Sequence, residues 1–297
     1  MPAVELNNIC KSYNGNLVVD NVSFTVAQGE IFGLIGPNGA GKTTTIRMMM
    51  DIIKPESGEI SILGERLNEA TKNRIGYLPE ERGLYRKLTV IDSLVYLASL
   101  KGITSHKARS RAEELLKRID MLPHKDKKTE ELSRGMGQLI QFLVTIIHDP
   151  QLVILDEPFA NLDPVNTELL KEIIIESRGQ GKAIILSTHM MNEVEALCDR
   201  ILMINKGRPV LYGELAEIKS RYRNNSVFLK FDGVLGEIEG VVRKKVHGDY
   251  VELFLDGETP PQKILQDLIS RGVEINQFEV STPPLNEIFL QVVEKGQ

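Results

Sequence analysis

The sequence predicts an α/β protein with an all-helical insertion and a small C-terminal α+β domain. Three observations lead to this prediction. Short apolar segments typical of buried strands alternate with helical stretches through most of the chain. Between residues 88 and 148 the strand candidates give way to strongly helical segments. After the polar pair Asn224 and Asn225, short strands and two helices follow in a different order.

Length and composition are those of an ordinary globular protein. The 297 residues are 42% hydrophobic and 26% charged, which is enough for one large and one small domain. A formal net charge of -5 gives no general attraction to nucleic acid, and we expect no nucleic-acid partner. The sequence contains no apolar run that could cross a bilayer and no secretory signal, so we expect a cytoplasmic location. Cys10 and Cys198, outside any CxxC spacing, are expected to be buried thiols.

The N-terminal part predicts a strand, a glycine-rich loop and a helix in that order. Residues 22–26 alternate in polarity, and residues 30–35 form an apolar run of buried-strand type. From Lys42 no helix breaker occurs until Pro55, which predicts a helix. Further strands are expected at residues 60–63, 74–78, 152–155, 183–187 and 200–204.

The helical insertion is expected at about residues 82–148. Thr89 and Asp92 have the spacing of a helix cap, and a helix is expected at residues 108–119. We place the boundary of the large domain between residues 222 and 223. In the C-terminal domain, residues 223–297, we expect strands at 227–231, 238–245, 250–255 and 273–280, and helices at 261–271 and from Pro284.

The glycine-rich loop predicts a phosphate-binding site. Residues 36–43, Gly-Pro-Asn-Gly-Ala-Gly-Lys-Thr, match the pattern in which backbone N–H groups surround phosphate oxygens at a helix N-terminus. Lys42 would reach the β and γ phosphates, and the Thr43 hydroxyl would bind Mg²⁺. The dinucleotide-binding alternative, GxGxxG, fails on the glycine spacing. The residues expected to bind nucleotide here are Gly36, Pro37, Asn38, Gly39, Ala40, Gly41, Lys42, Thr43 and Thr44.

Two carboxylates follow the apolar segment at residues 152–155. They stand at the C-terminal end of a predicted strand, where open α/β sheets bind their ligands. Asp156 is placed to hold Mg²⁺ through water. Glu157 would orient and deprotonate the attacking water. The alternative interpretation is an ordinary acidic start of a turn or helix.

The segment Leu132–Gln138, LSRGMGQ, resembles the signature motif of the ATP-binding-cassette (ABC) ATPases. Together with the phosphate loop and the Asp-Glu strand, it makes residues 4 to 220 similar to that family. The resemblance implies a P-loop NTPase fold of the ABC-ATPase type, with ATP and Mg²⁺ as cofactors. It further implies an ATPase that drives transport through a membrane permease.

The resemblance also implies roles that spacing does not show. Tyr13 corresponds to the ring that stacks on adenine; the alternative is an ordinary aromatic residue of a half-buried strand. Asp163, in Asn161-Leu162-Asp163, corresponds to a loop that communicates across a dimer; Asp-Pro is also an ordinary helix start. His189 resembles the histidine that contacts the γ-phosphate and the catalytic water. Lys42, Glu157 and His189 form the expected catalytic set.

Three residues depart from the family pattern. Glu80 replaces the usual glutamine, and we expect it to ligate Mg²⁺. Arg134 replaces the first glycine of the signature, and Met136 stands where glutamine is common. Arg134 would either hinder a close backbone approach or supply charge to the γ-phosphate, and the sequence leaves both open.

The family arrangement places ATP between the phosphate loop of one subunit and Ser133, Arg134 and Gly135 of another. A homodimer is therefore expected, held at the inner face of the cell membrane by a separate permease. The C-terminal domain resembles the tail of bacterial drug- and sodium-extrusion ATPases, which favours export. That domain would act in dimer contact or regulation, or as a stabilising appendage. Rival functions are a soluble ABC protein acting on ribosomes or DNA, and a module that binds ATP without hydrolysis.

Overall fold

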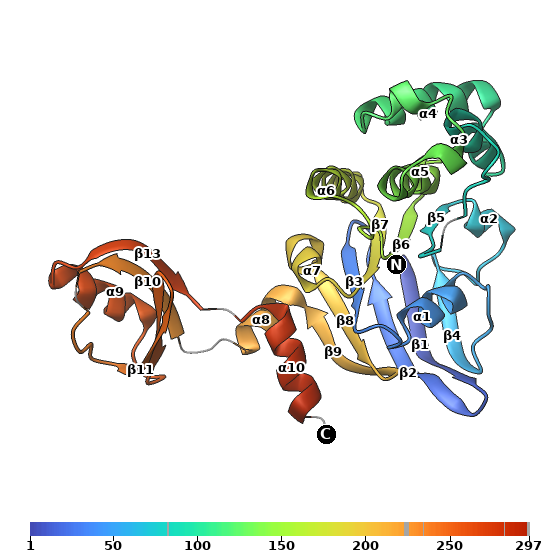
Figure 1. The fold of residues 1–297 in the computed structure, drawn as a ribbon. Coiled ribbons are helices and arrows are strands. Elements are labelled where there is room, and N and C mark those ends of the chain that lie inside the picture. The colour runs from blue at the N-terminus through green and yellow to red at the C-terminus, as the bar shows by residue number, and fades with distance from the viewer. Residues whose placement is uncertain (82, 223–225, 234, 282, 296–297) are drawn as a thin grey trace. The chain divides into compact units, whose positions relative to one another are not determined.

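The computed structural model describes residues 1–81, 83–222, 226–233, 235–281 and 283–295. They form two compact units, Met1–Leu215 and Ala216–Gln297 (Figure 1). We predicted the domain boundary between residues 222 and 223, after helix α8 (Leu215–Arg221), whereas the compact units divide at the start of this helix. Where the functional domain ends stays a prediction.

The first unit is built on a six-stranded sheet of order β5-β6-β7-β3-β8-β9. All pairings are parallel except that of β9 with β8. Every residue of β3, β6 and β7 is buried, which explains why these strands appear in the sequence as continuous apolar runs. The bounds are β3 Ile31–Ile35, β5 Ile75–Leu78, β6 Leu152–Asp156, β7 Ala183–Thr188, β8 Arg200–Asn205 and β9 Arg208–Glu214.

A second, antiparallel sheet of order β2-β1-β4 shares its core with the first. Its strands are β1 (Val4–Tyr13), β2 (Asn16–Val26) and β4 (Ser57–Ile62). The alternation predicted at residues 22–26 is confirmed, because Val22, Phe24 and Val26 are at most 2% exposed. They lie in one apolar cluster with strands of the larger sheet and with helix α1 (Lys42–Met49).

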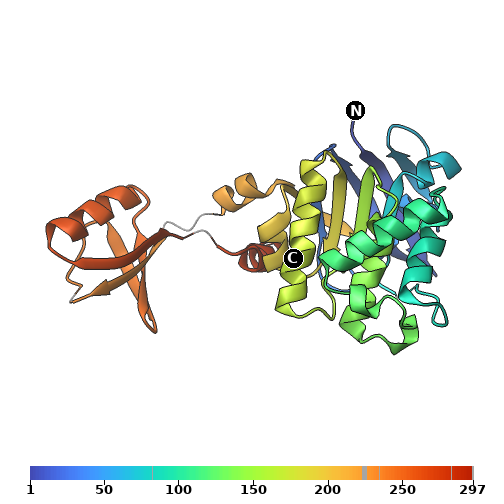
Figure 2. The same ribbon diagram turned by 90° about the horizontal axis from the view of Figure 1, so that it is seen from above.

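Helices α5 (Arg134–Ile146), α6 (Pro164–Gly179) and α7 (Met191–Leu197) lie on the other side of the six-stranded sheet (Figures 1 and 2). Helices α3 (Val90–Ser99) and α4 (Ser105–Arg118) pack together, and α3 also contacts α5, forming the predicted helical insertion. The cap predicted for α3 is confirmed, since Thr89 Oγ1 accepts from the Asp92 N–H at 3.1 Å. Shorter elements are α2 (Glu69–Lys72), η1 (Leu122–His124) and η2 (Thr129–Glu131).

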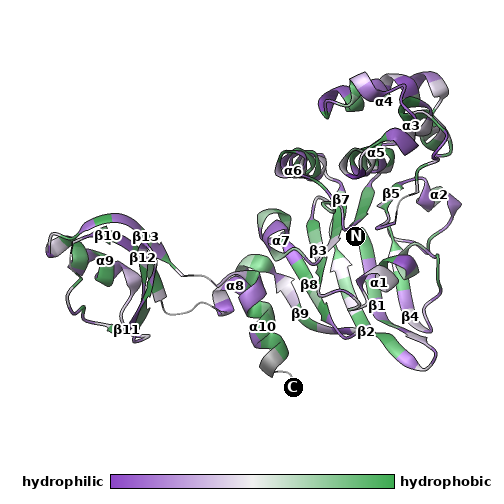
Figure 3. Cartoon of the chain, in the orientation of Figure 1, coloured by the Kyte–Doolittle hydropathy of each residue, from purple (hydrophilic) through white to green (hydrophobic). Residues whose placement is uncertain are grey.

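Helix α4 shows how the insertion is held with little apolar surface. Its buried residues are Ala108, Ala112 and Leu116, which recur every four positions and form one narrow stripe. Apart from the half-buried Leu115, the rest of α4 is polar, and Figure 3 shows the helix mostly hydrophilic beside the hydrophobic central strands. Helix α4 therefore presents a largely polar outer surface.

The second unit contains an antiparallel sheet of order β11-β12-β10-β13. Helix α9 (Pro261–Ser270) packs Ile264 and Leu268 against apolar residues of this sheet. The strand expected at 238–245 begins only at 241, because Gly240 has a φ of 84° and a Cβ there would lie 2.4 Å from Thr259 Oγ1. The remaining bounds are β10 Ser226–Asp232, β11 Val241–His247, β12 Tyr250–Leu255, β13 Glu274–Val280 and α10 Leu285–Lys295.

The two thiols differ in environment. Cys198 is buried, as predicted. The prediction for Cys10 is wrong: it is half-buried, and its Sγ accepts from the Asn21 N–H at 3.3 Å. Within the described part of the chain, no helix is both long enough and apolar enough to span a membrane.

The C-terminal core allows a test of local stability. Leu229 is 0% exposed, whereas Val246 on the edge strand is 73% exposed. Leu229→Ala should destabilise this unit by about 2–5 kcal/mol through lost burial and a cavity. Val246→Ala should change its stability by no more than about 0.5 kcal/mol. Hydrogen exchange of the β10 and β12 amides measures both, and equal protection in the two variants would contradict the core assignment.

Candidate functional site

The loop between β3 and α1 adopts a backbone that only glycine tolerates at two points. Gly36 has a φ of 149°, and a Cβ there would lie 2.1 Å from the Ile204 carbonyl oxygen. Gly41 has a φ of 108°, and a Cβ there would lie 2.6 Å from the Val18 carbonyl oxygen. Tight packing on both sides holds the loop at the N-terminus of α1, where free N–H groups favour an anion.

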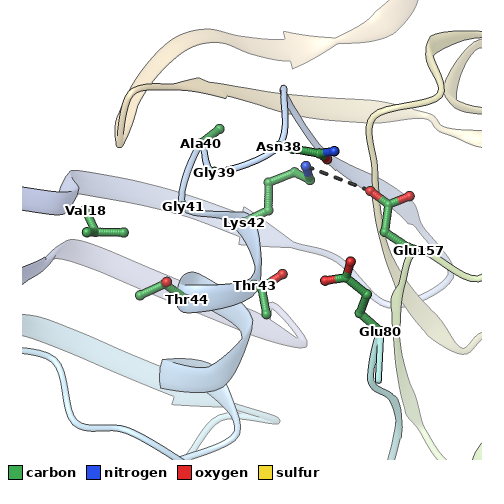
Figure 4. A pocket seen from close by; sticks show the side chains of 10 residues that line it. All are labelled: Val18, Asn38, Gly39, Ala40, Gly41, Lys42, Thr43, Thr44, Glu80 and Glu157. Atoms are coloured by element: carbon green, nitrogen blue, oxygen red, sulfur yellow. Dashed lines mark ion pairs between the residues drawn. The ribbon is translucent and has the colours of Figure 1, made fainter. Parts of the chain in front are cut away.

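A cavity of about 270 Å³ opens at this loop (Figure 4). It combines glycine-loop backbone, one lysine and two carboxylates from other elements. Its lining residues are Val18, Asn38, Gly39, Ala40, Gly41, Lys42, Thr43, Thr44, Glu80 and Glu157. Seven of the nine loop residues expected to bind nucleotide thus face one cavity; Gly36 and Pro37 do not line it.

Lys42 is held by the loop itself. Its Nζ donates to the carbonyl oxygens of Gly36 and Pro37 at 2.8 and 3.2 Å, so these two residues position the lysine. Nζ also lies 3.9 Å from Glu157 Oε1 (Figure 4). Burial lowers the pKa of Lys42, while the carboxylates of Glu157, Asp156 and Glu80 oppose that shift. Lys42 is a cation fixed at the cavity wall and suited to a phosphate group.

Asp156, the last residue of β6, is fully buried. Ser187 Oγ donates to its Oδ1 at 2.7 Å, whereas Oδ2 has no hydrogen-bond partner among the described residues. Burial raises the pKa of Asp156, and the hydroxyls of Ser187 and Thr43 oppose that rise. A buried carboxylate oxygen without a donor is costly unless a cation or its bound water occupies that position.

Glu157 is held in a strained backbone conformation at the end of the same strand. Its φ is 50°, which is uncommon for a residue with a side chain, and its N–H donates to the Ser187 carbonyl at 2.8 Å. The carboxylate accepts from Thr188 Oγ1 at 3.0 Å and lies 2.9 Å from His189 Nδ1. The structure therefore joins Lys42, Glu157 and His189, three residues that are far apart in the sequence, in one cluster.

Glu80 reaches the same cavity from the loop after β5. Figure 4 shows its carboxylate and the Thr43 hydroxyl directed toward a common space. Among the described residues, no three His, Cys, Asp or Glu side chains form a metal site by themselves. The donors present are a hydroxyl, an exposed carboxylate and the open oxygen of Asp156. That set fits Mg²⁺, which shares its coordination between protein oxygens, water and phosphate.

Two glutamines to which the sequence analysis gave no role connect α5 to the loops that contain Glu157 and Glu80. Gln138 is 5% exposed, and its Nε2 donates to the Pro158 carbonyl at 3.1 Å, directly after Glu157. Gln141 is 4% exposed, and its Nε2 donates to the carbonyls of Pro79 and Glu81, on either side of Glu80. Buried amides within the apolar helix segment QLIQFLVTI were the sequence signal for them.

The signature residues lie at the start of α5, away from the walls of the phosphate cavity. Ser133 caps the helix by accepting from the Met136 N–H at 3.2 Å. A Cβ at Gly135 would lie 3.0 Å from the Asn161 carbonyl, so this position requires a small residue. Arg134 is exposed and makes no hydrogen bond or ion pair with any residue that the structure describes.

Asp163 and Tyr13 have ordinary structural surroundings. Asp163 caps α6 by accepting from the Asn166 N–H at 2.9 Å, and this hydrogen bonding lowers its pKa. Tyr13 ends β1, is 45% exposed and has Lys11 Nζ 5.7 Å from its ring centre. It does not line the phosphate cavity. Their expected roles toward nucleotide stay predictions.

Comparison with known proteins gives two family matches. Residues 19–160 match the ABC transporter family, and residues 213–293 match the C-terminal domain of DrrA1-3-like ATP-binding proteins. The ABC transporter ATP-binding protein YhaQ of Bacillus subtilis is 41% identical over 97% of both chains. The linearmycin resistance ATP-binding protein LnrL of the same organism is 31% identical, also over 97% of both.

Similar solved structures are also subunits of ABC transporters. One described as the ATP-binding subunit of an ABC transporter superposes with a TM-score of 0.70 at 32% identity, covering 74% of this chain and 93% of that one. The cbiO1 protein of Clostridium perfringens, part of the transporter complex cbiONQ, superposes with a TM-score of 0.64 at 25% identity. The match covers 74% of this chain and 91% of cbiO1.

Fold and site define a P-loop ATPase. The chain belongs to the ABC transporter ATP-binding proteins. It binds ATP and is an ATPase coupled to transport, as the resemblance implied. The ATP-binding subunits of this family work with membrane permeases.

The glutamines of α5 allow a prediction that separates their two roles. Gln141→Leu leaves two carbonyls beside Glu80 without a donor, which costs about 1–3 kcal/mol. We expect it to weaken the apparent Mg²⁺ affinity in ATPase assays by about tenfold. Gln138→Leu, the matched variant beside Glu157, should instead lower kcat with little change in Mg²⁺ dependence. Identical effects of the two variants would contradict separate roles, and circular dichroism controls for folding.

Proposed function

We propose that two copies of this chain bind two ATP molecules between them and hydrolyse them to drive export through a separate permease. The observation that carries the proposal is the cluster beside the glycine loop, in which Glu157 lies 3.9 Å from the buried Lys42 and 2.9 Å from His189, with the buried Asp156 next to it in the chain. The signature residues of the same chain do not line that cavity. This separation supports a second copy as the source of Ser133 and Gly135 at each ATP.

Each residue of the cluster has a distinct role in the proposed hydrolysis. The loop N–H groups and Lys42 bind the β and γ phosphates and balance the charge that develops on them. Glu157 accepts a proton from the attacking water. His189, whose Nδ1 lies 2.9 Å from Glu157 Oε1, orients that carboxylate and contacts the γ-phosphate. Thr188, which donates to the other Glu157 oxygen at 3.0 Å, fixes the carboxylate plane.

Mg²⁺ would be held by Thr43 and Glu80, and through water by Asp156. Bound there, it would neutralise phosphate charge. Two observations support this assignment: Asp156 Oδ2 has no hydrogen-bond partner among the described residues, and Thr43 and Glu80 line the same cavity. A glutamate in place of the usual glutamine at position 80 adds a negative charge next to the triphosphate, so metal binding should depend strongly on this residue.

For Arg134 we favour the charge role over the steric one. The position that needs a small residue is Gly135, where a Cβ would lie 3.0 Å from Asn161, while Arg134 is exposed and unpaired among the described residues. It is the first residue of a helix whose first turn contains no acidic side chain. A guanidinium placed there suits a phosphate brought by the second copy.

Export is supported by the relatives' names and by the C-terminal family match. One relative is a linearmycin resistance protein, and the Nod factor export ATP-binding protein I of Sinorhizobium fredii is 34% identical over 98% of this chain and 85% of its own. We propose that the chain is a peripheral protein on the inner face of the membrane. The helical insertion would contact the permease, since Tyr85 and Tyr96 stack edge to face there and are 50% and 42% exposed.

The first test concerns hydrolysis. Glu157→Gln should retain ATP binding, lower turnover by about 10³-fold or more, and trap an ATP-bound dimer detectable by light scattering. Lys42→Ala should instead weaken ATP affinity itself, because it removes the phosphate cation. Glu168→Gln, at a carboxylate 69% exposed on α6, is the matched control and should hydrolyse normally. Near-normal turnover in Glu157→Gln would remove Glu157 from catalysis, and a monomeric ATP-bound form would contradict the dimer.

The second test concerns Arg134. Under the charge role, Arg134→Ala should lower the ATPase rate about tenfold or more, and Arg134→Lys should restore part of it. Under the steric role, Arg134→Gly should raise the rate. The three variants, compared in the same steady-state assay, therefore distinguish the two interpretations by the sign of the change.

The third test concerns partner and direction. Expressed with a candidate multi-span permease, the chain should co-purify with that protein, and ATP should drive substrate uptake into inverted vesicles. Tyr96→Ser should weaken co-purification while leaving the basal ATPase rate unchanged, because it removes an exposed apolar ring far from the nucleotide residues. Uptake into right-side-out vesicles would indicate import and contradict the proposed direction.

A further inference from the structure

The C-terminal sheet has one face covered by α9 and a second face that is partly open, which we call the open face: Ser226 and Glu252 are buried on it, whereas Tyr250 is 36% exposed. Its covered face points toward α9, and Val227, Leu229 and Leu253 on it are 0% exposed. The alternate residues of the same strands point away from this core. Phe228 lies opposite Glu279, and Lys230 lies opposite Gln277, in the pairing of β10 with β13. The open face therefore brings aromatic, charged and amide side chains together.

Aromatic rings on the open face are fixed by contacts with each other. Phe228 and Tyr250 meet edge to face, with ring centres 5.3 Å apart at 90°. His247 stacks on Tyr250 at 5.0 Å, and its Nε2 lies 3.2 Å from a carboxylate oxygen of Glu252. Ser226 Oγ donates to the other oxygen of Glu252 at 3.0 Å. These contacts satisfy Glu252 and His247 and hold the Tyr250 ring in one orientation.

A cavity of about 250 Å³ lies against these rings. It is lined by Phe228, Lys230, Asp249, Tyr250, Gln277 and Glu279. Lys230 and Asp249 form an ion pair at 2.5 Å, and each shifts the pKa of the other toward its charged form. Their two charges offset one another within the wall.

Glu279 is the charged group that remains without a cation. Its Oε2 accepts only from Gln277 Nε2 at 3.3 Å, and it forms no ion pair with a described residue. The cavity wall thus has one negative charge in excess, next to the rings of Phe228 and Tyr250. Aromatic rings attract cations at any face that neighbouring rings leave free.

We propose that this cavity binds a small organic cation, an ammonium group attached to an apolar or aromatic body. The ammonium would face Glu279 and the aromatic rings, and the apolar body would pack on Phe228 and Tyr250. A volume near 250 Å³ limits the ligand to a small molecule. Such a site would let the C-terminal unit respond to a compound of this class independently of nucleotide.

The test uses benzyltrimethylammonium as the probe, with benzyl alcohol and benzoate as neutral and anionic analogues. Titration calorimetry of the full chain without nucleotide should show binding of the cation with a Kd below about 1 mM and much weaker binding of both analogues. Shifts of the Tyr250 ring resonances should accompany binding. Absence of binding, or equal binding of benzoate, would overturn the proposal.

Matched variants locate the interaction. Glu279→Gln keeps the shape and removes the charge, and should weaken cation binding about three- to tenfold. Glu274→Gln makes the same change on the same strand at a residue that does not line the cavity, and should bind as the original chain does. Tyr250→Leu should also weaken binding. Equal affinity of Glu279→Gln and Glu274→Gln would overturn the site, and the ATPase rate of the same samples tests the proposed hydrolysis separately.

Discussion

The site depends on charged groups buried at the carboxyl edge of the six-stranded sheet. Lys42 is 6% exposed and Asp156 is 0% exposed, and removal of such groups from water is costly unless each has a partner. The Lys42 ammonium donates hydrogen bonds to two loop carbonyls, and its Nζ lies 3.9 Å from Glu157 Oε1. Asp156 is satisfied at one oxygen only. The second oxygen of Asp156 is therefore open to a cation or to a bound water.

The backbone around the cavity is strained where it brings these buried charged groups together. Glu157 has a φ of 50°, and Gly36 and Gly41 have left-handed conformations where no Cβ would fit. These conformations direct backbone N–H groups and one carboxylate into a space about 270 Å³ in volume. The surrounding core of completely buried strands β3, β6 and β7 is what holds them.

Helix α5 connects the parts of the site. Its first residues carry the signature, while Gln138 and Gln141, one turn apart, hold the loops that contain Glu157 and Glu80. A displacement of this helix must therefore move both loops or break these hydrogen bonds. The helical insertion packs on the same helix through α3, so α5 links the insertion to both loops.

The sequence by itself determined the class of fold, the family and the ATPase activity. Spacing predicted the glycine loop, the Asp-Glu pair after β6 and the cap at Thr89, because these are local patterns that neighbouring residues fix. The family and the ATPase activity rested on the resemblance of the segment LSRGMGQ to the ABC signature. Most of the predicted strands lie within two residues of their expected positions. Helix α1 ends at Met49, well before Pro55, β4 begins three residues earlier than expected, β11 begins only after Gly240, and β1 and β9 were not predicted.

Only the tertiary structure decided which distant residues meet. Ser187 and Thr188 orient Asp156 and Glu157, the Gln138 and Gln141 amides reach carbonyls 20 and 62 residues away, and Cys10 is half-buried where we expected burial. The aromatic cavity of the C-terminal sheet likewise requires strands β10, β12 and β13 to lie side by side. Such contacts depend on strand order and register, which no local pattern specifies.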